Sequence, residues 1–303
     1  MSRDAIEIVK DEVWKASVFA SRPLTTVRER FADAVFDAIG TEILEEQWDL
    51  LVVLDACRAD AARIVFDEYD FLETFETTFM KSSSSREFIA TNFRDRYQNE
   101  LARTAYVTGN PFSNDYLHDG DFALLDEVWR YEWDTDRGTI PPDAITDATV
   151  RACRNDDYDR TIAHYMQPHF PSLTDPDLGS AVDPETNVWI DSVWDRLEAG
   201  DVSRERVWNA YVDNLRHVLD SVEVLLRNVD AETVVVTADH GNGFGEHGIY
   251  GHPRLRTRRT LREVPWIVTS ATDTGEYEPA STADEVALTD DGVEERLRDL
   301  GYR

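Results

Sequence analysis

The side chains best suited to chemistry stand directly after a strand-like run. Residues 233–238 read Thr-Val-Val-Val-Thr-Ala, a composition typical of strands buried on both faces, and Asp239 and His240 follow at once. In open α/β sheets, ligands bind just outside the carboxyl ends of the strands. Asp239 and His240 are therefore predicted to lie at a strand tip and hold a metal ion. The alternative is a helix or loop start capped by Asp239, with His240 incidental.

A second carboxylate occupies a similar position. The apolar run at residues 50–54 ends in Asp55 and leads into a helix-like segment at 61–66, which is the pattern of a βα unit. Together with Asp239 and His240, Asp55 would complete a set of oxygen and nitrogen ligands. Such a set suits one divalent metal, with Mn²⁺ or Zn²⁺ favoured and Ca²⁺ or Mg²⁺ as alternatives. Asp55 could also cap the following helix.

Four adjacent serines, 82–85, precede a predicted helix. Ser84 and Glu87 fit a capping box, so the run could simply mark the start of a helix. A hydroxyl in the first helical turn also lies where backbone N–H groups and the helix dipole favour an anion. If the metal contacts Ser85 as well, the Ser85 hydroxyl would be acidified into a nucleophile.

Short apolar strands alternate with helical segments along the chain, which predicts an α/β fold with a largely parallel sheet covered on both faces. Residues 112–150 are predicted to be an extended insertion with a turn at Pro141 and Pro142, and the longest helix is expected at 203–228. Strands are predicted at 50–54, 71–81, 105–108, 161–166, 233–238 and 264–269. The polar residues after these strands should gather at one edge: Asp55, Asn110, His169, Asp239 and His240.

Three parts are expected along the chain. Residues 1–47 have helical periodicity and are predicted to form an N-terminal helical lead-in. Residues 48–271 would form the catalytic domain. Residues 272–303 would be an acidic C-terminal segment ending in a short helix, at 293–300, packed on the same domain.

The composition limits the partners. The 303 residues carry a formal net charge of −30, which repels nucleic acid and anionic membrane. A hydrophobic content of 42% and eight tryptophans argue against disorder, so the chain is interpreted as a globular protein adapted to high salt. Since no apolar run has the length of a transmembrane helix and the N-terminus is not signal-like, a cytoplasmic location is predicted.

Four motifs together resemble a known family. Residues 51–60 (LVVLDACRAD), 164–171 (HYMQPHFP), 237–248 (TADHGNGFGEHG) and 250–253 (YGHP) resemble motifs of the alkaline phosphatase superfamily, and especially of its sulfatase-like branch. They occur in the order of that family and span most of residues 50–270. The nearest resemblance is to sulfatase-like proteins of salt-loving archaea, which agrees with the acidic composition.

This resemblance implies a three-layer α/β/α sandwich with a phosphoryl- or sulfuryl-transfer site. Asp55, Asp239 and His240 match the metal ligands of the family. Ser85 falls where the family has its nucleophile, which also contacts the metal, and Ser82, Ser83 and Ser84 are alternatives.

Further residues match substrate-binding positions. His169 and His252 match positions that bind substrate oxygens or protonate the leaving group, a role that suits histidine near neutral pH. Arg58 is a candidate for binding the anionic substrate, although it could instead pair with Asp60 and brace the loop.

The departures from the family pattern favour phosphate-type esters. Sulfatases convert a cysteine or serine in the signature C/S-x-P/A-x-R, and neither Cys57 nor Cys153 has the arginine of this signature. Ser82 has Arg86 at the right spacing, but Ser84 stands where proline or alanine is required. Ala56 replaces the second carboxylate of many sulfatases, which favours a single ion of the Mn²⁺ or Zn²⁺ type.

The predicted function is a metal-dependent hydrolase or transferase that acts on a small anionic phosphate-type ester, free or linked to a glycan or lipid. The alternatives are a sulfatase-like sulfuric ester hydrolase and a catalytically silent relative that binds an anionic glycan or lipid head group. A second metal could be bound by Asp213, His217 and His252, although a D-x-x-x-H pair on a helix is commonly a solvated face.

Overall fold

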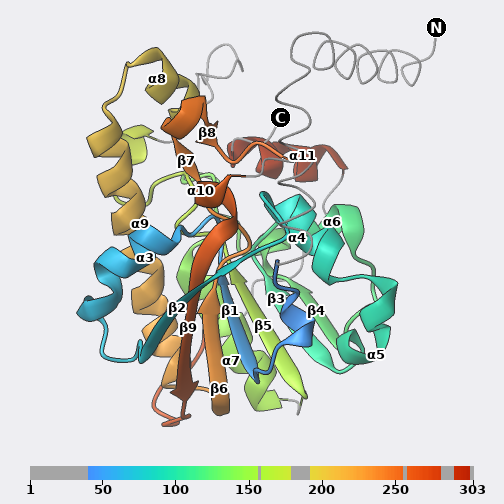
Figure 1. Ribbon diagram of the computed structural model, residues 1–303. Helices are drawn as coiled ribbons and strands as arrows, with labels where there is room; N and C mark the ends of the chain where they lie inside the picture. The colour runs from blue at the N-terminus through green and yellow to red at the C-terminus, as the bar shows by residue number, and fades with distance from the viewer. Residues whose placement is uncertain (1–39, 156–157, 179–191, 255–257, 281–289, 301–303) are drawn as a thin grey trace, which may run out of the picture.

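The structure is a computed structural model that describes residues 40–155, 158–178, 192–254, 258–280 and 290–300 (Figure 1). Most of the predicted lead-in at 1–47 lies outside the described residues. The part that is described contains the short 3₁₀ helix η1 (Ile43–Glu45), in which Ile43 and Leu44 are buried in the main hydrophobic core. The boundaries proposed for the three parts of the chain stay a prediction.

A seven-stranded sheet runs through the centre of the molecule in the order β2-β9-β6-β1-β5-β3-β4. Its strands are β1 (Leu50–Leu54), β2 (Thr74–Phe79), β3 (Thr104–Thr108), β4 (Leu124–Glu127), β5 (Arg160–Tyr165), β6 (Ala231–Thr237) and β9 (Glu263–Ala271). Neighbouring strands pair in parallel except at β9, which is antiparallel to both β6 and β2. The predicted largely parallel sheet is confirmed.

Helices cover both faces of the sheet. The connections from β1 to β2, from β4 to β5 and from β5 to β6 run in the same direction along the sheet. They carry, on one face, α3 (Ala59–Val65), α7 (Pro142–Asn155) and α9 (Arg204–Leu226). The connections from β2 to β3 and from β3 to β4 run the other way along the sheet and carry, on the opposite face, α4 (Ser85–Asn92), α5 (Gln98–Leu101) and α6 (Ser113–Tyr116). The central strand β1 is buried at every residue, as its continuous apolar sequence predicts for a strand covered on both sides.

The prediction of an extended insertion at 112–150 is wrong, because this region contains α6, β4 and the first half of α7. Helix α7 begins at Pro142, a position where proline is favoured because its missing N–H would have no intrahelical partner. Its buried face includes the polar residues Thr146 and Thr149 and the small residues Ala148 and Ala152. Thr149 bonds to the carbonyl of Ile145, and Thr146 bonds to the hydroxyl of Tyr165. These hydrogen bonds make buried threonines acceptable there.

The remaining elements are short. The helix α11 (Asp290–Asp299) starts earlier than the expected 293–300 helix, and its Val293 and Leu297 are buried in the main core.

Among the described residues, no helix is long and apolar enough to cross a lipid bilayer. The other short elements are α8 (Val193–Ala199), α10 (Arg259–Arg262), β7 (Gly243–Phe244), β8 (Tyr250–Gly251), η2 (Phe66–Glu68), η3 (Asp95–Tyr97), η4 (Val128–Arg130), η5 (Pro176–Leu178) and η6 (Glu246–Gly248).

Candidate active site

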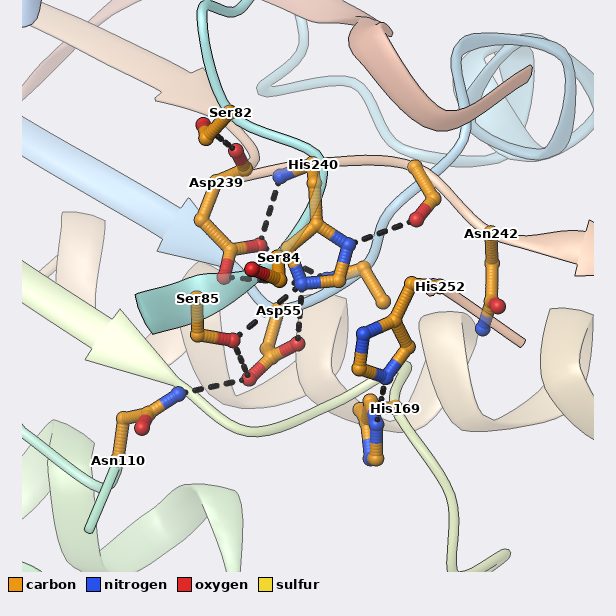
Figure 2. A network of polar contacts seen from close by, with 12 residues as sticks. Asp55, Ser82, Ser84, Ser85, Asn110, His169, Asp239, His240, Asn242 and His252 are labelled. Carbon is orange, nitrogen blue, oxygen red and sulfur yellow. Dashed lines mark hydrogen bonds and ion pairs between the residues drawn. The ribbon is translucent and has the colours of Figure 1, made fainter. Parts of the chain in front are cut away.

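Three predicted ligands meet at the carboxyl ends of the central strands. Asp55 follows β1, and Asp239 and His240 follow β6, the neighbouring parallel strand. The three side chains point toward one another (Figure 2). One potential ligand atom from each lies within 4.8 Å of the others, and all three residues are fully buried. Within the described ranges, this is the one group of three or more such residues that could hold a metal ion.

A tight turn after β1 connects the two carboxylates. Ala56 has a left-handed backbone, with φ of 60°, which is strained for a residue with a side chain. Its N–H donates to Oδ1 of Asp239 at 2.9 Å, and its carbonyl accepts from the hydroxyl of Tyr211 at 2.6 Å. These two long-range hydrogen bonds hold the turn in place, so the strained backbone helps to orient Asp239.

The ring of His240 is fixed with its Nε2 toward the carboxylates. Its Nδ1 lies 2.7 Å from the carbonyl of Gly241, and because a carbonyl only accepts, Nδ1 must carry the proton. In the neutral ring, Nε2 then has a lone pair, and it lies 3.3 Å from Oδ2 of Asp239 and 3.5 Å from Oδ1 of Asp55. Gly241 allows this close loop, since a Cβ there would come within 2.2 Å of the carbonyl oxygen of Thr260.

This arrangement fits a cation. Oδ1 of Asp55 and Oδ2 of Asp239 are buried and have no hydrogen-bond partner among the described residues. They lie 3.5 Å and 3.3 Å, respectively, from Nε2 of His240. Burial raises the pKa of Asp55 well above its usual range, and the nearby charge of Asp239 raises it further. A divalent metal would satisfy all three atoms, and carboxylate oxygen with imidazole nitrogen is a set suited to Zn²⁺ or Mn²⁺.

The four serines differ in what they contact. Ser84 is the N-cap of α4 and accepts from the N–H of Glu87, as the capping motif predicts. Ser82 donates to the carbonyl of Asp239 at 2.6 Å, and Ser83 to the carboxylate of Glu87 at 3.0 Å. We call Asp55, Asp239 and His240 the ligand group. Ser85 is the first residue of α4 and is the serine whose hydroxyl reaches this group (Figure 2). Its Oγ lies 3.2 Å from Asp55 Oδ2 and 3.3 Å from His240 Nε2.

Asn110 has a role at the site that the sequence did not indicate. Its Nδ2 donates to Oδ2 of Asp55 at 2.9 Å, and its Oδ1 accepts from the N–H of Phe112 at 3.0 Å. The amide is therefore held on both sides and orients the Asp55 carboxylate. The available signal was its place after β3, which predicted its position at this edge but no partner.

His169 and His252 form a buried pair beside the ligand group. Their Nε2 atoms lie 2.8 Å apart, and the rings of His252 and His240 are 4.5 Å apart between centroids. Burial lowers the pKa of His169 to about 4 and that of His252 well below its usual range, so both are neutral near pH 7. Nδ1 of His169 donates to the carbonyl of Phe170, which leaves its Nε2 as the acceptor of a proton carried on His252 Nε2.

Arg58 does not face the ligand group as a free cation. Its guanidinium pairs with Asp60 at 2.6 Å and with Glu246 at 3.0 Å, and it donates to the carbonyl of Asn242 at 3.0 Å. It also lies over the ring of Trp208. The alternative stated from the sequence, in which Arg58 pairs with Asp60 and braces the loop, agrees with these contacts. A substrate-binding role for Arg58 has no support from its geometry.

The residues proposed for a second metal are not brought together. Asp213 and His217 lie on the exposed side of α9, where Asp213 pairs with Arg216 at 2.8 Å. His252 instead lies beside His240 and His169. The D-x-x-x-H pair is therefore a solvated helix face.

Solved structures with a similar fold include transferases and sulfatases. The integral membrane protein lipooligosaccharide phosphoethanolamine transferase A (EptA) from Neisseria meningitidis aligns with 90% of this chain at 14% identity and a TM-score of 0.53. This chain spans 59% of that protein. The soluble domain of the same transferase aligns with 75% of this chain and 77% of its own length, at 14% identity and a TM-score of 0.49.

A 2-O GAG sulfatase aligns with 74% of this chain and 64% of its own length, at 12% identity and a TM-score of 0.48. No protein-family model matches this sequence, and no curated protein matches it. At such identities the likeness concerns the fold alone. The chain has an α/β fold similar to that of the integral membrane transferase, with the largely parallel central sheet that the sequence predicted.

Proposed function

We propose that this protein transfers a phosphate-type group from a small anionic ester to Ser85, and from there to water or a second alcohol. The observation that carries the proposal is the position of the Ser85 hydroxyl, 3.2 Å from Oδ2 of Asp55 and 3.3 Å from Nε2 of His240, beside two buried carboxylate oxygens that have no hydrogen-bond partner among the described residues. Asp55, Asp239, His240 and Ser85 would hold the metal. Zn²⁺ or Mn²⁺ bound there supplies Lewis-acid polarisation of the phosphoryl oxygen and lowers the pKa of the serine hydroxyl.

The side chains of this chain have separate tasks in the transfer. Oδ2 of Asp55 lies 3.2 Å from Ser85 Oγ and is the nearest carboxylate to receive the hydroxyl proton. Asn110 keeps that oxygen in place. The bond from Ser85 Oγ to phosphorus forms as the bond to the leaving oxygen breaks. The first turn of α4 favours the negative charge of the entering group.

The two neutral histidines complete the proposed site. His252 carries a proton on Nε2, and this N–H lies beside the ring of His240. A leaving oxygen bound beside His240 would replace His169 Nε2, now 2.8 Å away, as the acceptor of this N–H. Because neither ring is charged near pH 7, the pair acts through hydrogen bonds rather than as a cationic clamp.

Phosphate is preferred to sulfate as the transferred group. The serine run lacks the proline or alanine of the sulfatase signature, and an unmodified serine suits phosphoryl transfer. The fold likeness to a lipooligosaccharide phosphoethanolamine transferase adds phosphoethanolamine esters and a lipid-linked acceptor to the compounds worth testing.

A substrate panel tests the proposal directly. The metal-loaded protein is assayed in high salt with aryl phosphate, phosphodiester, phosphonate and sulfate esters, beside Ser85→Ala and Ser83→Ala. We expect turnover of a phosphate-type ester, a loss of at least about 10³-fold in Ser85→Ala, and at most a few-fold change in Ser83→Ala. Full activity in Ser85→Ala would contradict the serine mechanism. Turnover of sulfate esters alone would favour the sulfatase, and a metal-bound but inert protein would favour the silent binding relative.

A further inference from the structure

One buried histidine next to the site has no part in the transfer proposed above. His164 is a residue of β5, the strand that pairs with β1, and its side chain is fully buried. Its ring packs edge-on against Phe88, with centroids 5.9 Å apart, and obliquely against Tyr106, with centroids 6.1 Å apart. A histidine that served only to fill this aromatic core could be replaced by a hydrophobic residue, so its polar atoms need an explanation.

The contacts on its two sides assign the tautomer of His164. The phenol oxygen of Tyr106 lies 2.8 Å from Nδ1. On the other side of the ring, Nε2 lies 3.9 Å from Oδ2 of Asp239, and a carboxylate oxygen accepts hydrogen bonds. The ring proton is therefore placed on Nε2, toward this acceptor, and the phenol donates to Nδ1.

The Nε2–H of His164 points toward the metal-binding carboxylate. Nε2 lies 3.9 Å from Oδ2 of Asp239, and neither atom has a hydrogen-bond partner among the described residues. The other oxygen of Asp239 is already occupied, since Oδ1 accepts from the N–H groups of Ala56 and His240. A donor and an acceptor that are both buried and unsatisfied thus lie 3.9 Å apart, so a small shift of either side chain would form a hydrogen bond. Because Nε2 carries the proton, His164 offers no lone pair there to a metal.

We propose that His164 is a positioning residue for the ligand group. The Nε2–H of His164 orients Oδ2 of Asp239, while Tyr106 holds the imidazole ring in the required tautomer. This inference rests on the proposed function, because it requires that Asp239 binds a metal. Ligating carboxylates are commonly hydrogen-bonded by such outer residues, and loss of one of these partners typically costs about 10- to 100-fold in metal affinity.

The test measures metal affinity rather than turnover. The full-length protein is stripped of metal and titrated with Zn²⁺ against a competing chelator, and with Co²⁺ while its visible absorption is followed. The variants are His164→Phe, which keeps an aromatic ring but removes both nitrogens, and Tyr106→Phe, which removes only the phenol oxygen. Tyr165→Phe is the matched control, since its buried hydroxyl also makes a 2.8 Å hydrogen bond, to Thr146 on the other side of β5.

We expect His164→Phe to weaken Zn²⁺ binding by about 10- to 100-fold and Tyr106→Phe by a smaller factor, with a change in the Co²⁺ spectrum in both. Tyr165→Phe should keep its affinity within about two-fold, as expected for a substitution without contact to the metal group. If His164→Phe does not fold, the comparison of Tyr106→Phe with Tyr165→Phe still decides. A purely structural role would lower the melting temperature of the metal-free variants and leave metal affinity unchanged, which would overturn this inference alone. Absence of metal binding in the unmodified protein would overturn the proposed function as well.

Discussion

Two aspartate–histidine pairs in this protein have the same side chains and opposite surroundings. Asp239 and His240 are fully buried at the tip of β6, and Oδ2 of Asp239 has no hydrogen-bond partner among the described residues. Asp213 and His217 lie one helical turn apart on the exposed side of α9, where Arg216 neutralises Asp213. Water and a neighbouring cation satisfy the second pair, whereas the first pair has neither.

This difference indicates which of the two pairs could hold a metal. Residue types and short spacing are the same kind of signal in both pairs, and the sequence suggested metal binding for each. Burial without a compensating charge is what separates them, because an ionised carboxylate away from water is costly unless it is paired or binds a metal. We therefore expect metal binding at Asp239 and His240, and none at Asp213 and His217.

The largest effect is expected from removing one charge of the buried group. Asp239→Asn keeps the Oδ1 acceptor for the N–H groups of Ala56 and His240 but replaces the oxygen that faces His240. We expect about one transition metal per chain in the unmodified protein and at least about a 100-fold weaker affinity in the variant, as for loss of a metal partner. Elemental analysis of protein purified in high salt measures this.

Asp213→Asn is the control for that experiment, and its metal content should be unchanged. A reading near two metals per chain, reduced in Asp213→Asn, would show that the exposed pair also binds metal and would contradict the difference between the two pairs.

Since the charge of Asp239 disfavours ionisation of Asp55, the metal-free Asp239→Asn protein should be at least as stable as the unmodified protein. Thermal denaturation in chelator checks this point.

The next largest effect is expected at Gly241, which shapes the loop of the buried pair. A Cβ there would lie 2.2 Å from the carbonyl oxygen of Thr260, a backbone atom that cannot rotate away. Gly241→Ala should lower the free energy of unfolding by about 1–3 kcal/mol, as for other overpacked sites, and should weaken metal binding by moving His240. Gly248→Ala has open space around it and should cost only the left-handed backbone strain of about 1 kcal/mol. Equal metal affinity in the two variants would contradict this role for Gly241.

A smaller, pH-dependent effect is expected from the ion pair between Arg58 and Glu246, which lies beside the site. Burial raises the pKa of Glu246, but the N–H of Phe244 and the charge of Arg58 outweigh it and lower the pKa below its usual value. The pair therefore contributes stability above the unfolded pKa of about 4.3, and this contribution is lost as the pH falls through the lower folded pKa. Urea unfolding between pH 6 and pH 3 should show a flatter acid slope in Glu246→Gln. Identical slopes would show that the pair does not stabilise the loop.

The smallest effect is expected on the exposed pair. His217→Ala removes a side chain from the solvated face of α9, so stability should change by at most about 0.5 kcal/mol and metal content should not change. His240→Ala, measured beside it, should lose the metal. A loss of metal in His217→Ala would mean that the two pairs are not as different as their surroundings indicate.

Much of the fold follows from the sequence because its strands are short, apolar and buried on both faces. The runs at β1 and β6 predicted strands, a largely parallel sheet and polar residues at the strand tips. The helix α7 was missed because its buried face consists largely of threonines and alanines rather than large apolar residues. The antiparallel direction of β9 also could not be predicted, since strand direction depends on the path of the connection from β6.

The sequence by itself determined which side chains stand at the ends of the strands, because local patterns of apolar residues set where each strand stops. Only the tertiary structure decided which of them form a site. The contact of Asp239 with Ala56 and that of Ser85 with His240 join residues far apart in the chain. Whether a carboxylate oxygen is left without a partner depends on such contacts. The structure therefore placed Ser85 rather than its three neighbours against the ligand group, and left Asp213 and His217 in solvent.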